Sequence, residues 1–265
     1  MSRFRRITAI AITLTSLAIA AACVAAIGHA PNPSTAPSAT LHPSSPSTST
    51  PPVSAPTAPT GDYFTVLGTA QRLYVPAQTG VVEYCPVDRL GRAVCAYGDL
   101  TSSQRRAAEA RGREEITVAP AGWGHNRTVT IPAAPGVAGS ASYRGWFWNR
   151  SHLVADSLGG AASLQNLITG TRPQNVGSTK IDGQYAGGMA YAETRARAYL
   201  DTHDGDECPL YYAATPTYAG DALVPASVIV DMRSCDGAVD ERVEISNTAN
   251  GWAIDYQTGT FSPVP

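Results

Sequence analysis

Short runs of mostly apolar residues, separated by polar and turn-forming positions, predict several strands, most of them in the C-terminal quarter of the chain. The runs concerned are rich in aromatic residues, Ala or β-branched residues, and Gly, Pro, Asp or Asn lie near their ends. Such residues are typical of turns, so each run is expected to form one strand. The predicted strands are residues 63–67, 72–75, 210–217, 224–232, 243–246 and 252–256.

Two segments show helical periodicity instead. Residues 187–202 place Met189, Ala192, Ala196, Tyr199 and Leu200 at helical spacings, which predicts one apolar helix face. Residues 102–113 are rich in Ala and Arg and follow capping residues at 99–102. Together with the strands, they predict an α+β fold on a largely antiparallel sheet.

The N-terminal 60 residues differ in composition from the rest. Residues 1–30 combine Arg3, Arg5 and Arg6 with an uncharged apolar stretch at 7–27, which predicts a signal peptide or a membrane anchor. Residues 31–60 carry no charge and contain 9 Pro and 13 Ser or Thr, which predicts a disordered linker. The folded domain is therefore expected at 61–265, in a protein that is secreted or held at the cell surface through its N-terminus.

Four cysteines lie within the predicted domain. Because exported proteins oxidise their cysteines, we expect two disulfides. Plausible turns lie between Cys85 and Cys95 and between Cys208 and Cys235, which favours these two pairs. The spacings match no common zinc knuckle.

Charge is distributed unevenly along the predicted domain. Residues 61–200 carry 14 Arg plus Lys against 10 Asp plus Glu, whereas residues 201–265 carry 2 against 11. An enzyme acting on nucleic acid needs positive potential only along its groove, so the net charge of −2 does not exclude a polyanionic substrate.

Polar residues suited to phosphodiester hydrolysis gather in two neighbouring blocks. The first is Asn149-Arg150-Ser151-His152, and the second, at 165–175, contains Asn166 and Asn175. A histidine can act as a general base, and an amide oxygen can bind a hard metal ion. These blocks predict a nuclease.

The same residues, with Gly159-Gly160, Tyr191-Ala192-Glu193 and the segment 253–259, resemble the DNA/RNA non-specific endonucleases of the ββα-metal (His-Me finger) type. Asn149 and Ser151 stand where that family has the Asp and Gly of its Asp-Arg-Gly-His hallmark. The resemblance implies a ββα-metal core and hydrolysis of DNA, with RNA as a second candidate substrate and no nucleotide cofactor.

Roles follow from the resemblance by position. His152 would be the general base, Arg150 would face the scissile phosphate, and Asn175 would bind Mg²⁺, for which Mn²⁺ would substitute. Glu193 would hold waters around the ion, and Asn166 would shape the metal loop as a further member of the catalytic set.

Three more residues are candidates for contacts with the nucleic acid. Arg195 and Arg197 lie near Glu193 on the predicted helix 187–202 and are available for phosphate or for pairing with Glu193. Trp148, beside Trp146, could stack on a base, although core packing is the alternative for at least one of the two.

Two other functions remain open from the sequence. One is a catalytically inactive extracellular protein that binds DNA, which the changes at Asn149 and Ser151 would permit. The other is a secreted nuclease toxin, for which a cognate inhibitor is the expected partner. A wall or membrane contact through the N-terminus fits any of these.

Overall fold

The computed structural model describes residues 61–203 and 205–265, which lie in one compact unit. The predicted signal peptide or anchor at 1–30 and the linker at 31–60 lie outside these residues. No helix within the described ranges combines the length and the apolar character that crossing a bilayer requires.

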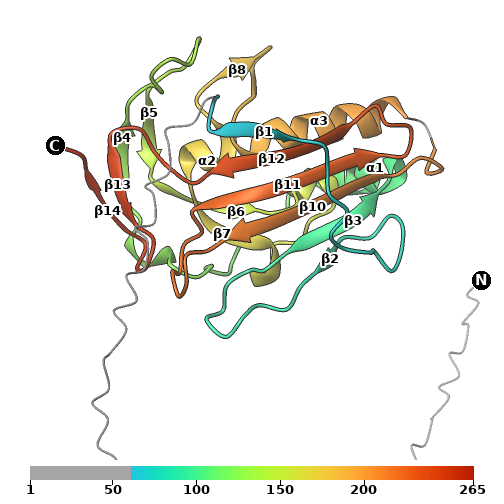
Figure 1. Ribbon diagram of the computed structural model, residues 1–265, viewed down its shortest axis with the longest axis horizontal. Helices are drawn as coiled ribbons and strands as arrows, with labels where there is room; N and C mark the ends of the chain where they lie inside the picture. Colours follow the sequence, from blue (N-terminus) through green and yellow to red (C-terminus); the bar gives the residue numbers. More distant parts are fainter. Residues whose placement is uncertain (1–60, 204) are drawn as a thin grey trace, which may run out of the picture. The chain divides into compact units, whose positions relative to one another are not determined.

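The described residues form mostly antiparallel strands with few helices (Figure 1). The strands are β1 (Phe64–Gly68), β2 (Glu83–Tyr84), β3 (Ala96–Leu100), β4 (Thr128–Ile131), β5 (Tyr143–Trp146), β6 (Trp148–His152), β7 (Leu167–Thr171), β8 (Lys180–Ile181), β9 (Gln184–Tyr185), β10 (Leu210–Thr217), β11 (Ser227–Ser234), β12 (Asp240–Ser246), β13 (Trp252–Asp255) and β14 (Thr260–Pro263). The helices are α1 (Ser102–Arg111), α2 (Arg172–Val176) and α3 (Met189–Thr202), with short 3-10 turns η1 (Trp123–His125), η2 (Asp156–Leu158) and η3 (Leu164–Asn166).

One six-stranded sheet dominates the fold, in the order β1-β12-β11-β10-β3-β2. All of its strand pairs are antiparallel, and β10 pairs with β11 along its full length, from Leu210 opposite Ser234 to Thr217 opposite Ser227. The predicted α+β class and antiparallel sheet are therefore confirmed. The strand predicted from 224 begins at Ser227, after Pro225, a residue that cannot donate to a ladder.

The outer face of the sheet is crossed by an extended segment, where a strand was predicted at 72–75. That prediction is wrong, because the segment bonds to side chains of the strands it crosses and pairs with none of them. The amide of Gln71 donates to Asp231 at 2.7 Å, and the amide of Tyr74 donates to the Tyr211 hydroxyl at 3.2 Å.

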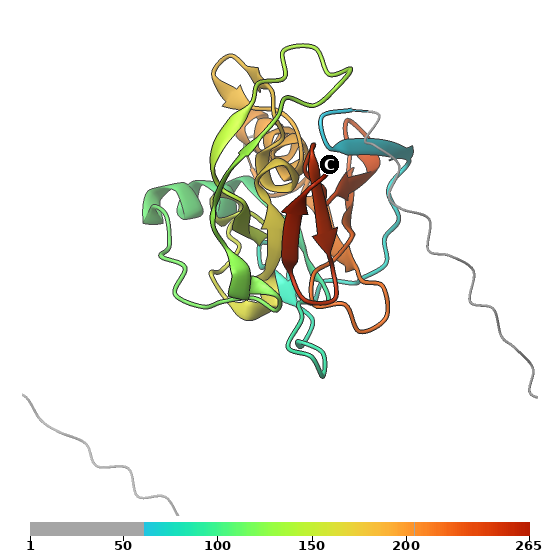
Figure 2. The same cartoon turned by 90° about the vertical axis from the view of Figure 1, so that its left-hand side faces the viewer.

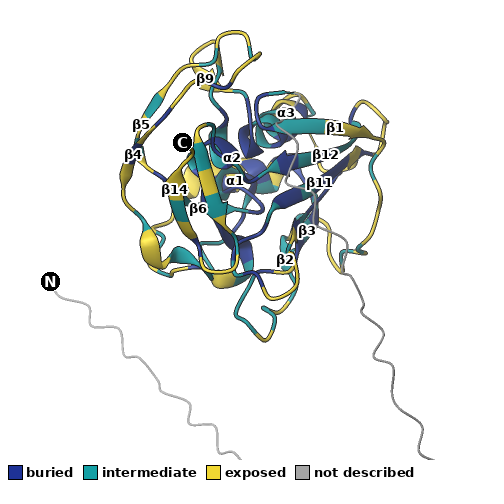
Figure 3. Cartoon of the chain, turned by 60° about the vertical axis from the view of Figure 1, so that its left-hand side comes forward, coloured by how far each residue is buried: buried dark blue, intermediate teal, exposed yellow. Residues whose placement is uncertain are grey.

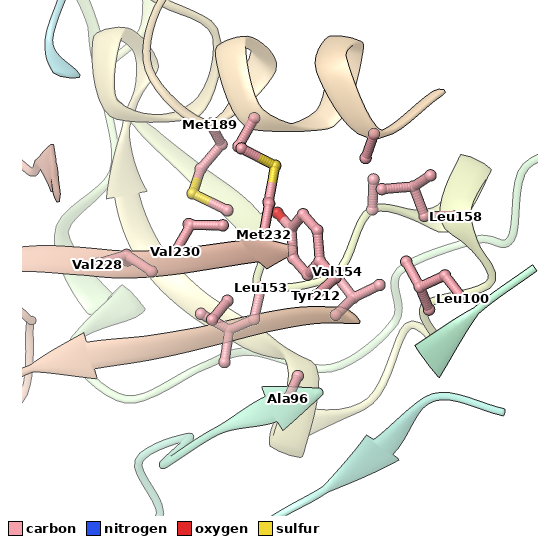
Figure 4. Packing of buried hydrophobic residues seen from close by; sticks show 14 of the residues in the cluster. Ala96, Leu100, Leu153, Val154, Leu158, Met189, Tyr212, Val228, Val230 and Met232 are labelled. Carbon is pink, nitrogen blue, oxygen red and sulfur yellow. The ribbon is translucent and has the colours of Figure 1, made fainter. Parts of the chain in front are cut away.

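Helices α1 and α3 and the strand pair β6–β7 lie on the other face (Figures 1 and 2). Figure 3 shows the buried residues concentrated between these layers. The five positions that predicted the apolar face of α3 are all buried there. Met189 belongs to one buried cluster with Tyr212, Val230 and Met232 of the sheet and with Leu153, just after β6 (Figure 4).

A second, smaller core fixes the approach to β6. Phe147 and Trp148 are buried there, and Phe147 stacks on Phe261 of β14 with ring centroids 3.8 Å apart. The Trp148 indole donates to the Gly259 carbonyl at 3.0 Å. The hairpin β13–β14 therefore holds the strand that carries Asn149 to His152.

Both predicted disulfides are confirmed. Cys85 is bonded to Cys95 in the loop before β3, and Cys208 is bonded to Cys235 across the adjoining ends of β10 and β11. The pairing of Leu210 with Ser234 places the second pair in the register expected from the sequence.

Asp62 ties the start of the domain to the loop that follows α2. Its carboxylate is 6% exposed and accepts hydrogen bonds from the backbone amides and hydroxyls of Ser178 and Thr179. Asp62→Ala is expected to lower the free energy of unfolding by about 3 kcal/mol, because it leaves several buried donors of a charge-assisted network unpaired. Urea unfolding measures this change.

A suitable control is Glu115→Ala, which removes an exposed carboxylate and should change stability by less than about 0.5 kcal/mol. If the two variants unfold at the same urea concentration, Asp62 does not anchor this loop.

Candidate active site

Strands β6 and β7 and helix α2 form a compact ββα unit. The two strands pair antiparallel, with Trp148 opposite Thr171 and His152 opposite Leu167. Helix α2 starts directly after β7, where the Thr171 hydroxyl caps it by accepting from the Gln174 amide at 3.0 Å. The chain thus reverses direction and returns Asn175 to β6.

Ser151 links the two predicted blocks directly. Its buried hydroxyl donates to Oδ1 of Asn175 at 3.0 Å. A carbonyl oxygen has two lone pairs, so this bond orients the Asn175 amide and leaves one lone pair for a further partner.

A hollow of about 370 Å³ brings four of the predicted residues together. We call it the reaction hollow. Its lining includes His152 and Arg150 from β6, Asn175 from α2 and Glu193 from α3. These side chains come from separate elements, so their meeting depends on the packing of α3 against the ββα unit.

The environment of His152 favours the neutral form of its imidazole. Its Nε2 is buried and has no hydrogen-bond partner among the described residues. Burial lowers its pKa from 6.5, and Arg113 lowers it further, whereas Asp156 and Glu114 act in the opposite direction. A neutral imidazole with a free nitrogen can accept a proton.

Glu193 faces the same hollow from α3. Its side chain is 17% exposed, and burial raises its pKa to about 7, against the lowering effects of Arg197 and Arg113. The Arg197 guanidinium is 3.7 Å from the carboxylate. A cation in the hollow would favour the charged form of Glu193.

Arg150 is held in place from two sides. Its guanidinium lies over the ring of Trp123, 4.7 Å from the centroid, and donates to the Ile116 carbonyl at 3.0 Å. Its Nε is buried without a partner in the described part of the chain. Arg150 therefore presents a fixed positive charge to the hollow.

Arg113 is a site residue that the sequence reasoning missed. It is exposed and follows the end of α1 at Gly112. It lines the reaction hollow and also a second hollow that adjoins it. Among the described residues no carboxylate pairs with it within 4 Å. Its position in a loop gave no periodic signal in the sequence.

The two arginines predicted to contact substrate point elsewhere. Arg195 pairs with Glu241 of β12 at 2.7 Å, so it faces the sheet. Arg197 donates to Ser157 at 3.1 Å and to Thr194 at 2.9 Å. Neither lines the reaction hollow. Arg197 lies 3.7 Å from Glu193, which is the pairing that the sequence offered as the alternative to substrate contact.

The burial of Trp148 favours core packing, the alternative that the sequence left open for one of the two tryptophans. Trp148 is 1% exposed and its indole N–H is already bonded in the core. The exposed tryptophan is Trp146, at 59%. Between them, Phe147 is buried as well. Strand alternation would place Trp146 and Trp148 on the same face, but β5 ends at Trp146 and β6 begins at Trp148, so the two side chains differ in exposure.

Asn166 supports the site from behind. It is fully buried, its Oδ1 accepts from the Val154 amide, and its Nδ2 donates to the carbonyls of Val154 and Ala161, each at 2.9 Å. With its amide committed to these bonds, Asn166 fixes the loop after His152 and does not reach the hollow.

Few side chains of the site could bind a metal ion, and those that could are hard oxygen donors. The described residues contain no cluster of three or more His, Cys, Asp or Glu side chains suited to a metal. The reaction hollow offers the free lone pair of Asn175 Oδ1 and the carboxylate of Glu193. Its other carboxylate, Asp156, is paired with Arg111 at 2.9 Å. This set fits a hard divalent ion that keeps most of its ligands as water or substrate oxygens.

The chain is similar to known nucleases along most of its length. The family described as DNA/RNA non-specific endonuclease matches residues 74–236. A deoxyribonuclease of Streptococcus dysgalactiae subsp. equisimilis is 31% identical over 251 residues, which cover 77% of this chain and 74% of that protein.

Solved structures give the same result. The structure of Sda1 nuclease with bound zinc ion is 30% identical, covers 77% of this chain and 97% of its own, and has a TM-score of 0.65. NucA from Streptococcus agalactiae with magnesium ion bound, at 23% identity, covers 74% of this chain and 85% of its own with a TM-score of 0.54. NucA shares the fold.

Proposed function

Since this chain belongs to the DNA/RNA non-specific endonuclease family and is a DNA-hydrolysing endonuclease, we propose that it cleaves with His152 as general base and one divalent metal ion. The predicted family, fold class and enzyme class are thereby confirmed. The observation that carries the proposal is the buried, unpartnered Nε2 of His152, in one hollow with the Asn175 amide that Ser151 holds.

In this mechanism the residues of the hollow divide the work. His152 takes a proton from the attacking water, for which a base positioned at the reacting atom is worth about 10²–10⁴-fold in rate. Arg150 neutralises charge on the phosphate. Asn175 and Glu193 would hold the ion, which would stabilise the charge developing on the phosphate and the leaving oxygen.

Mg²⁺ is the ion we propose, with Mn²⁺ as a substitute. Zinc is bound in the Sda1 structure, which supports a divalent ion in this family. The donors of this chain are an amide oxygen and a carboxylate, and such oxygens favour Mg²⁺ or Mn²⁺ over softer metals.

The enzyme is proposed to act outside the cell, with residues 61–265 as the nuclease domain. The signal-like pattern at 1–30 and the two disulfides support export, because disulfides persist in oxidising compartments. RNA is proposed as a second substrate.

Supercoiled plasmid provides the direct test. Incubation with Mg²⁺ should give nicked and then linear DNA, and EDTA should prevent both. A folded protein that shifts the plasmid on a gel without cutting it in Mg²⁺, Mn²⁺ or Zn²⁺ would contradict the proposal and favour a DNA-binding role.

The pH dependence follows from the two shifted groups. The base form of His152 is required and its pKa is lowered from 6.5, so at saturating Mg²⁺ cleavage should persist through pH 6.5 and fall only below it. At low Mg²⁺ the fall should move toward pH 7, because protonation of Glu193, with a pKa of about 7, competes with the ion. Profiles of kcat/KM at two Mg²⁺ concentrations measure both effects.

Glu193→Gln is the matched variant, since it keeps the shape of the side chain and removes its titration. Its profiles should fall at the same pH at both Mg²⁺ concentrations. A wild-type profile that falls above pH 6.5 at saturating Mg²⁺ would show that His152 is not the limiting base.

A further inference from the structure

We propose that the cleft continues beyond the reaction hollow into a binding site for single-stranded nucleic acid, in which Trp146 stacks on a base and Arg172 and Lys180 bind phosphates. This inference rests on the proposed function, because it extends the same cleft.

Three hollows adjoin one another in series. A middle hollow of about 590 Å³ shares Arg150 and Asn175 with the reaction hollow. At its other end it shares Tyr143 and Arg172 with a distal hollow of about 310 Å³, which also includes Lys180. A strand bound at Asn175 can therefore extend along the cleft toward the hairpin of β8 and β9.

Trp146 presents an unused aromatic surface in the middle hollow. It ends β5 and is 59% exposed. Among the described residues, no other aromatic side chain is as exposed. The hairpin of β8 and β9 beyond it is exposed too (Figure 3). Base stacking on an aromatic face contributes about 1–3 kcal/mol and accepts any base, which suits a non-specific nuclease.

The cations of the distal end lie on aromatic rings, without carboxylate partners. Arg172 lies over Tyr143 at 5.2 Å and over Tyr185 at 4.8 Å, and Lys180 lies over Tyr185 at 4.6 Å. No described carboxylate pairs with either cation within 4 Å, and none lines the middle or distal hollow. The cations are thus free to bind phosphate.

Gly145 leaves room for this arrangement. A Cβ at Gly145 would lie 2.1 Å from the Tyr143 hydroxyl oxygen, so the tyrosine side chain occupies the space that any other residue would fill. The lack of a side chain at Gly145 therefore allows Tyr143 to lie where Arg172 packs on it.

A single strand fits these features better than a duplex. Arginine and lysine contacts to phosphate would serve either form. The exposed indole favours a base that is not already stacked within a helix, because only such a base has a free face. The site is thus expected to favour unpaired regions of its substrate.

Fluorescence anisotropy in EDTA tests the site without any cleavage. Wild-type protein should bind an oligothymidylate of about 12 nucleotides more tightly than a duplex of the same length. Trp146→Leu should weaken single-strand binding about tenfold, within the range expected for one lost stack, and should change duplex binding less. Trp146→Phe, which keeps an aromatic face, should retain most of the affinity.

Salt dependence separates the phosphate contacts from stacking. Arg172→Ala and Lys180→Ala should each reduce the slope of log affinity against log salt by about 0.7 for a single strand. Arg89→Ala is the control: this arginine pairs with Asp221, is 70% exposed and lines none of the three hollows, so its slope should equal that of the wild type.

Equal affinity of the wild type for both forms of DNA, or unchanged single-strand binding by Trp146→Leu, would overturn the inference. Because the assay contains no metal, absence of plasmid cleavage would contradict the proposed function alone. Normal cleavage with an unaffected Trp146→Leu variant would contradict this site alone.

Discussion

Replacing His152 with alanine is expected to reduce the rate of DNA cleavage by about 10²–10⁴-fold, the typical contribution of a positioned general base. The imidazole lines the reaction hollow, its Nε2 is buried without a partner among the described residues, and its pKa is lowered, which favours the neutral form that can accept a proton. Single-turnover cleavage of a labelled oligonucleotide at saturating Mg²⁺ measures the loss.

His203→Ala serves as the matched histidine control. His203 lies at the end of α3, where its ring contacts Asp236 at 3.1 Å and the Tyr199 carbonyl at 2.8 Å, and it lines none of the hollows. This variant should cleave at the wild-type rate. The His152→Ala protein should keep its circular dichroism spectrum and its affinity for DNA in EDTA; if it also retains full cleavage, the base is another group.

Local patterns determined much of the fold in advance. The apolar spacing of residues 187–202 predicted α3 and its buried face, and the run 210–217 coincides with β10. Helix α3 buries one face at helical spacing, and β10 is a short, mostly apolar run that is buried along most of its length, so local sequence identifies both elements. The segment 72–75 has a similar composition, but its extended form depends on Asp231 and Tyr211, which are distant in sequence and invisible to a local pattern.

The site was predictable only in part for the same reason. His152, Asn175 and Glu193 meet as expected, but Arg195 is two positions from Glu193, and such residues do not share a helix face. Its partner Glu241 could be identified only from the packing of α3 against β12. Arg113 and Trp146 entered the site through loop and strand-junction geometry, which carry no periodic signal.

The serine that replaces glycine in the family hallmark has a structural explanation. The Ser151 hydroxyl bonds to Asn175, and the space for it comes from Gly170 across the strand pair, where a Cβ would lie 2.8 Å from Cβ of Ser151. We infer that the substitution supports the Asn175 amide directly, so this departure from the hallmark is compatible with activity.

Asn175→Ala is accordingly expected to raise the Mg²⁺ concentration for half-maximal cleavage by roughly 100-fold, because it removes the amide oxygen proposed to hold the ion. Ser151→Ala should raise it by about tenfold, as expected for loss of a residue that orients a ligand. Metal titrations of cleavage, together with calorimetric titration of Mn²⁺ into the protein without DNA, measure the two effects.

Asn175→Asp separates loss of the ligand from loss of the fold. The aspartate keeps an oxygen that can accept from Ser151 and adds a negative charge, so it should bind the ion at least as tightly as the wild type. The Mg²⁺ concentration for half-maximal cleavage is expected to be highest for Asn175→Ala and lower for Ser151→Ala. It should be lowest for the wild type and Asn175→Asp. If Asn175→Ala shows the wild-type requirement in both titrations, the ion is held elsewhere. Glu193 then becomes the residue to test, because its carboxylate lines the reaction hollow, whereas the other carboxylate there, Asp156, is paired with Arg111.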